Sequence, residues 1–129
     1  MVIDRRTRCR LRHVLRNRLH RHEITRPRDS ALITLGRCQA QIQHALLGAL
    51  TALRLVQAGH PNASAWAKAS KAEGVETAHA AVTELLPLAG APAYQRGAVP
   101  VKALIDLGGL RLADGIHDEL HRSVGRTLL

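Results

Sequence analysis

The chain has 129 residues, of which 46% are hydrophobic and only 2% are aromatic. This length is enough for one small domain with its own core, and the abundance of Ala and Leu over aromatic residues excludes a typical β-sheet protein and favours an all-α fold. The formal net charge of +9 is concentrated at one end, because residues 1–28 carry +8 and residues 29–129 carry +1.

The first segment, residues 1–28, is an Arg-rich arm in which ten Arg accompany only two acids, Asp4 and Glu23. Pro27 interrupts any helix and marks the boundary with the rest of the chain. Three interpretations stay open: an extension without a defined fold, an arm that attracts nucleic-acid phosphates, and a targeting peptide. The arm has no aromatic residue for base stacking, no recognisable nucleic-acid module and no apolar region of a secretory signal.

The first strong helix is predicted over residues 30–58, where Asp29 or Ser30 caps its start and Gly59 and Pro61 end it. One face is continuously apolar and comprises Leu35, Cys38, Ile42, Leu46, Ala49, Leu53 and Val56. Further apolar residues lie off this face, namely Leu32, Leu47, Leu50 and Leu55. Such a helix needs a second contact, with another domain or another subunit.

The second helix is predicted over residues 63–86, and Pro87 and Gly90 are expected to end it. The side chains expected to face inward are Trp66, Val75, Ala78, Val82 and Leu85. A loop is expected at residues 90–99.

The third helix is predicted to start at Pro100, which suits a first helical turn. The fourth is predicted over residues 116–128, because apolar residues recur there every four positions: Ile116, Leu120, Val124 and Leu128. Short connections between these helices favour an antiparallel arrangement. The sequence therefore predicts an all-α bundle of about four antiparallel helices at residues 29–129, preceded by the basic arm.

Asp114 is the sharpest catalytic candidate, since a carboxylate held on a rigid turn at a helix start can act as a general base. The alternative is that Asp114 and Gly115 form only a turn and cap. His117 and His121 have the spacing of two zinc ligands on one helix. No third ligand follows, so we expect a solvated polar face there and no metal site.

Cys9 and Cys38 are too few and too distant in sequence to indicate a disulfide framework. No apolar run reaches the length that spans a bilayer. These observations favour a cytoplasmic protein without a membrane partner.

Several short motifs follow one another along residues 30–129. They are Lys68 and Lys71 on an Ala-rich helix, LAGAPAY at 88–94, PVKALID at 100–106, Asp114-Gly115, and RTLL at 126–129. In this order and spacing they resemble the C-terminal helical domain of the acyl-CoA dehydrogenase family. The family's last segment has a carboxylate-Gly pair followed by an apolar helix that ends in Arg and a Leu pair.

The resemblance implies an FAD-dependent oxidoreductase that introduces an α,β double bond into acyl-CoA thioesters. Asp114 takes the place of the family's base, which removes the α-proton, while the flavin accepts the hydride. Gly90 and Gly115 take the places of glycines near the cofactor; for Gly90, a helix C-cap is the alternative. Ile116 stands where the family has Thr. Leu120, or His121 if one residue is inserted, stands where the family has Gln.

The family's other domains, which build most of the flavin and substrate sites, have no counterpart in this sequence. We therefore expect the isolated chain to be inactive or nearly so, whether it is a truncated gene product or a subunit of a split enzyme. The expected partners are an acyl-CoA substrate and either further copies of the chain, as a homo-oligomer, or a flavin-bearing subunit. The alternative function is that of a small helical protein that binds nucleic acid through residues 1–28.

Overall fold

The computed structural model describes residues 29–113 and 115–129, and its regular elements are all helical. In chain order they are α2 (Asp29–Gln57), α3 (Ala63–Ala89), the 3-10 helix η1 (Ala91–Tyr94), α4 (Val99–Leu110) and α5 (His117–Arg126). No strand occurs within the described ranges, so the predicted all-α fold is confirmed. The predicted arm at residues 1–28 lies outside them.

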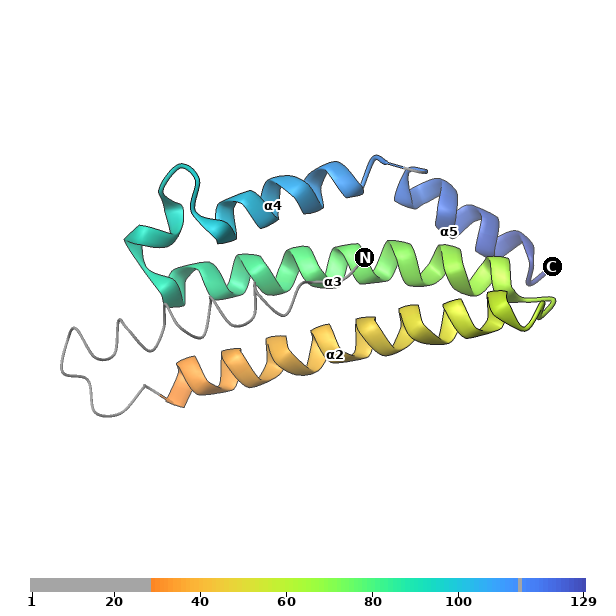
Figure 1. The fold of residues 1–129 in the computed structure, drawn as a ribbon, viewed down its shortest axis with the longest axis horizontal. Coiled ribbons are helices and arrows are strands. Elements are labelled where there is room, and N and C mark those ends of the chain that lie inside the picture. The colour runs from red at the N-terminus through yellow and green to blue at the C-terminus, as the bar shows by residue number, and fades with distance from the viewer. Residues whose placement is uncertain (1–28, 114) are drawn as a thin grey trace.

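Helix α3 is the centre of the fold (Figure 1). Helix α2 runs antiparallel along one side of α3, and α4 and α5 follow one another along the other side. Among the described helices, α2 contacts only α3. Within the described ranges the bundle is therefore open, because no other described helix covers the rest of α2.

The core lies on both sides of α3 and is built largely from small side chains. Three clusters form it: Cys38, Ile42, Ala81 and Leu85 between α2 and α3; Val75, Ala78, Val82 and Leu107 between α3 and α4; and Leu86, Ala89 and Ala93 at η1. Small residues also let α2 and α3 approach closely, and the Ser70 hydroxyl donates to the carbonyl of Gly48 across 3.2 Å.

Helix α3 continues through Pro87 to Ala89, so the prediction that it ends at residue 86 before Pro87 is wrong by three residues. In the last turn a proline removes only one backbone hydrogen bond, which the helix tolerates. Gly90 then ends the helix with φ of +73°, and its N–H donates to the carbonyl of Pro87 at 3.2 Å. Gly90 is thus the C-cap of α3, as its alternative interpretation predicts. The loop expected after it contains η1.

The prediction that Trp66 faces inward is wrong, because this side chain is 48% exposed. Leu53 and Val56, at the end of the apolar face predicted for the first helix, are each 53% exposed. Helical periodicity identifies an apolar face but does not say whether another helix covers it. These side chains lie along α2 and the start of α3, where α3 is the one described helix that contacts α2.

The last helix is shorter than the predicted 116–128. Ile116 precedes it as the N-cap, and Leu128 follows its end and is 82% exposed. Only Leu120 and Val124 of the predicted apolar face are half-buried.

Candidate functional site

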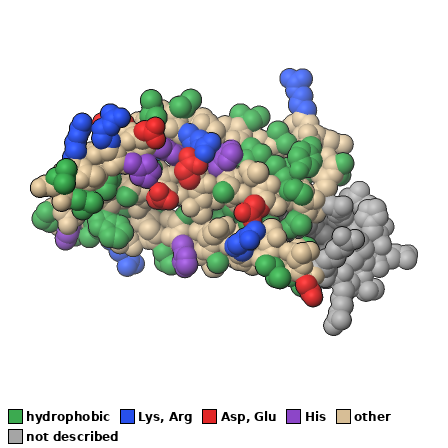
Figure 2. All heavy atoms as spheres, turned by 180° about the vertical axis from the view of Figure 1, so that it is seen from behind, with side chains coloured by type: hydrophobic (Ala, Val, Ile, Leu, Met, Phe, Trp, Pro, Cys, Tyr) green, Lys and Arg blue, Asp and Glu red, His purple; other side chains and the backbone are tan. Residues whose placement is uncertain are grey.

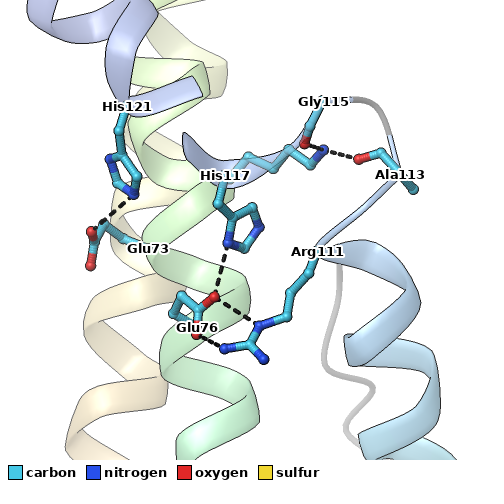
Figure 3. A network of polar contacts seen from close by, with 8 residues as sticks. Glu73, Glu76, Arg111, Ala113, Gly115, His117 and His121 are labelled. Atoms are coloured by element: carbon cyan, nitrogen blue, oxygen red, sulfur yellow. Dashed lines mark hydrogen bonds and ion pairs between the residues drawn. The ribbon is translucent and has the colours of Figure 1, made fainter. Parts of the chain in front are cut away.

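A row of charged side chains on α3 faces α5 and the connection between α4 and α5 (Figure 3). We call it the polar seam. It consists of Lys68, Lys71, Glu73 and Glu76 of α3 together with their partners Arg111, Ala113, Gly115, His117, His121 and Ser123. Acidic, basic and histidine side chains also gather over the middle of the face shown in Figure 2.

Glu76 is the most heavily engaged residue of the polar seam. Its Oε1 atom accepts a hydrogen bond of 2.8 Å from Nε of Arg111, and its Oε2 atom accepts a second one from Nη2. The bond from Arg111 is the main reason that the pKa of Glu76 lies below its ordinary value, and the contact with His117 lowers it further. The same pair raises the pKa of Arg111. A two-bond contact of this kind fixes the orientation of both groups.

His117, the first residue of α5, lies buried against Glu76 (Figure 3), with its Nδ1 atom 3.0 Å from Oε1. A carboxylate can only accept, so Nδ1 carries the proton of this bond. The expected solvated polar face is therefore wrong at His117. Periodicity within the last helix does not reveal that its first turn docks on α3. The Nε2 atom is buried and has no hydrogen-bond partner among the described residues.

A second histidine-carboxylate contact lies one turn later in α5 and one turn earlier in α3. There His121 lies opposite Glu73, with 3.7 Å between Nε2 and Oε1. Both groups are largely exposed, so this contact is weak. Beyond it, Nζ of Lys68 donates to the Ser123 hydroxyl at 2.6 Å. Polar contacts thus accompany α5 from its first residue to near its end.

Lys71 of α3 binds the connection between α4 and α5 through backbone carbonyls. Its ammonium donates to the carbonyl of Ala113 and, at 3.3 Å, to that of Gly115 (Figure 3). Gly115 has φ of +110°, which L-residues rarely adopt, so glycine suits this position. Asp114, the predicted base between these two residues, lies outside the described residues.

The structure does not bring the two predicted cofactor-binding glycines together. Gly90 precedes α4 and Gly115 follows it. With its 12 residues, α4 is about 18 Å long. Gly90 and Gly115 therefore lie beyond opposite ends of α4.

Two hollows lie between α2 and α3. An apolar groove of about 310 Å³ is lined mainly by Ile42, Leu46, Ala49, Leu53, Val56 and Val75. A more polar hollow of about 340 Å³ is lined by Gln41, His44, Ser70, Glu73 and Thr77, among others. Gly90 and Gly115 line neither of them.

Cys38 is buried, and its Sγ atom lies 3.7 Å from Oε2 of Glu84. Burial, and then the charge of Glu84, raise the pKa of the thiol. Both effects disfavour the thiolate, so Cys38 is a poor nucleophile. Within 29–113 and 115–129, no three His, Cys, Asp or Glu residues lie close enough to hold a metal ion.

Sequence reasoning missed Glu76 and Arg111. A signal was present: four charged residues stand within nine positions of an otherwise Ala-rich helix, namely Lys68, Lys71, Glu73 and Glu76. His117 and His121 repeat at a similar interval on the last helix, as expected of two helices that pair polar groups along one contact.

Comparisons of this chain with known protein families, with characterised proteins and with solved structures found no match. None of the described helices is both long enough and apolar enough to cross a membrane.

Proposed function

We propose that the chain is the C-terminal helical part of a cytoplasmic, flavin-dependent acyl-CoA dehydrogenase and that it works only with a flavin-bearing partner. The comparisons found no match, so the proposal rests on the order and spacing of the motifs along residues 30–129. One structural observation supports it: the segment that carries Asp114 and Gly115 is tied to α3 by Lys71, which fixes the backbone on both sides of the carboxylate.

A fixed backbone is what a general base requires. Removal of the α-proton of an acyl thioester needs a carboxylate positioned within hydrogen-bonding reach of that carbon. The Asp side chain is one methylene shorter than that of Glu. It therefore has less freedom to reposition its carboxylate when the backbone moves. In the proposed function Asp114 abstracts the proton, and Lys71 acts as a positioning residue.

In the proposed function, the described residues of one chain supply only part of the flavin site. Gly90 and Gly115 are separated by the length of α4, and the two hollows between α2 and α3 include neither glycine. In the proposed function, the partner therefore holds most of the redox cofactor. We expect the purified chain to retain no flavin and to show no turnover with a panel of acyl-CoA thioesters. Stoichiometric flavin and turnover in the isolated chain contradict this expectation.

The role of Asp114 is tested by grafting residues 100–129 onto a full-length acyl-CoA dehydrogenase in place of its own last segment. Replacing Asp114 by Asn in the graft should lower the rate by about 10² to 10⁴ because the base is lost. Asp106→Asn is the matched control, since this exposed carboxylate pairs with Lys102 on the same helix. If the grafted enzyme with Asp114→Asn turns over as fast as the grafted enzyme with Asp114, the proposal is wrong.

The concentration of charge in residues 1–28 supports a second candidate, a nucleic-acid-binding protein. The intact chain should then bind duplex DNA at low salt and lose roughly a thousandfold or more in affinity between 50 and 200 mM salt. Deletion of residues 1–28 should abolish this binding, because residues 29–129 carry only +1. Absence of binding at low salt by the intact chain excludes this candidate.

A further inference from the structure

The polar hollow between α2 and α3 is a cavity that the proposed function does not use. Its volume is about 340 Å³. One water molecule occupies roughly 30 Å³ in the liquid, so the hollow has room for a ligand of roughly ten non-hydrogen atoms. Five polar side chains line it, and two glycines, Gly48 and Gly74, line it without a side chain.

The two glycines keep the polar hollow open. Both lie inside helices, where glycine is less favourable than alanine. Packing does not require glycine at either position. A Cβ atom at Gly74 would meet no atom within 4 Å, and one at Gly48 would make an ordinary contact of 3.6 Å with Oγ of Ser70. Alanine would therefore fit at both positions, but its methyl groups would take up space in the hollow.

The polar hollow presents hydrogen-bonding groups that the described chain does not use. Oε1 of Gln41 is buried without a partner there, which is unfavourable for a polar atom. Within the described ranges the Thr77 hydroxyl makes no hydrogen bond, whereas that of Thr83 on the same helix donates to the carbonyl four residues earlier. The Ser70 hydroxyl donates its proton to the carbonyl of Gly48, so toward a ligand it can only accept. The hollow therefore offers mainly acceptors.

The charge of the polar hollow is negative. Glu73 is the one acid among the lining residues, and no Lys or Arg of the described chain lines it. The side chain of Glu73 is 70% exposed, and its contact with His121 is loose, at 3.7 Å (Figure 3). Its carboxylate can therefore turn toward a ligand in the hollow. A carboxylate among acceptor oxygens attracts a group that carries a positive charge and N–H donors, and it repels an anion.

We propose that the polar hollow binds a small organic cation, an aliphatic ammonium or guanidinium compound of up to roughly ten non-hydrogen atoms. Glu73 pairs with the cationic group, and Gln41 and Ser70 accept hydrogen bonds from its N–H groups. The aliphatic stem of the ligand lies against Ala45 and Gly74. This inference goes beyond the proposed function and depends on neither flavin nor acyl-CoA.

NMR titration of the full chain near neutral pH tests the proposal with a set of probes that share a butyl stem. Butylammonium and butylguanidinium should bind saturably, with a Kd of about 1 mM or below, and should shift the amide signals of Gly48 and Gly74. The tighter of these two probes identifies the cationic group. Uncharged 1-butanol and anionic butyrate should bind at least about tenfold more weakly. The proposal is wrong if neither cation binds saturably up to about 20 mM, or if all the probes bind equally.

Two substitutions in the polar hollow test its place in the binding. Gly74→Ala should weaken binding of the cation about tenfold, because the added methyl group occupies the hollow. The same substitution favours the helix, so weaker binding does not result from unfolding. Gly36→Ala is the matched control, since Gly36 lies on α2 outside the hollow and its Cβ atom would also meet open space.

Glu73→Gln should also weaken binding about tenfold, because a charged hydrogen bond becomes a neutral one. Glu119→Gln removes the same charge from α5, where Glu119 pairs with Arg122, and should leave binding unchanged. If Gly74→Ala and Glu73→Gln both bind the cations as tightly as the parent chain, the ligand lies elsewhere and the proposal is overturned.

Discussion

The Nδ1 atom of His117 lies 3.0 Å from Oε1 of Glu76, although 41 residues separate them in the chain. The same carboxylate accepts two hydrogen bonds from Arg111. One side chain of α3 therefore joins the end of α4 to the start of α5. The connection between these helices is held at both of its ends, and Lys71 holds it in the middle.

Replacement of Glu76 by Gln should lower the free energy of unfolding by about 1 kcal/mol, because the charged contacts with Arg111 and His117 are lost in a half-exposed setting. Urea denaturation followed by circular dichroism measures this change. Glu119→Gln is the matched control, since Glu119 pairs with Arg122 within α5 and should change the free energy by only about 0.3 kcal/mol. Equal effects of the two substitutions contradict the central role of Glu76.

The contribution of Glu76 should depend on pH. Its pKa is lower in the folded chain than the ordinary 4.5. Its ionised form therefore stabilises the fold fully above that value, and this stabilisation disappears as the pH falls below 4.5 through the folded pKa. The stability difference between the parent and Glu76→Gln should shrink from pH 6 to about pH 3. A difference that stays constant over this range shows that the Glu76 pairing does not depend on its charge.

Lys71→Met should loosen the connection between α4 and α5 without unfolding the chain. Methionine retains most of the side-chain volume but cannot donate to the carbonyls of Ala113 and Gly115. Backbone amides of Glu119 and Leu120, in the first turn of α5, should exchange about tenfold faster, which corresponds to about 1.4 kcal/mol. Lys102→Met, which breaks only an exposed pair with Asp106, should leave these amides unchanged. Unaltered exchange in Lys71→Met removes Lys71 from its proposed positioning role.

Gly115→Ala should destabilise the chain by about 1–2 kcal/mol. The φ of +110° is unfavourable for alanine, and its Cβ atom would lie 3.1 Å from Cδ2 of Leu120. Gly109→Ala is the opposite case, because Gly109 is helical and its Cβ atom would meet open space. That substitution should raise stability by about 0.5–1 kcal/mol. Thermal unfolding of both variants measures the contrast, and a stabilising Gly115→Ala would show that the connection adapts freely.

The sequence by itself determined the helices and most of their limits. The first helix is predicted over residues 30–58 and observed at Asp29–Gln57. Pro100 lies in the first turn of α4, and Gly90 caps α3, as the sequence indicates. These features depend on backbone chemistry within a few residues: a proline has no N–H to lose, and a glycine tolerates positive φ. Such signals are local and can therefore be recognised without knowledge of the fold.

Only the tertiary structure decided which faces of the helices are covered and which polar groups meet. Trp66 is exposed and His117 is buried, although apolar periodicity predicts the reverse. Glu76 and Arg111 acquire their partners only when α4 and α5 dock on α3. Burial and long-range pairing depend on which helix lies opposite each face, and the pattern within a single helix carries no information about its neighbour.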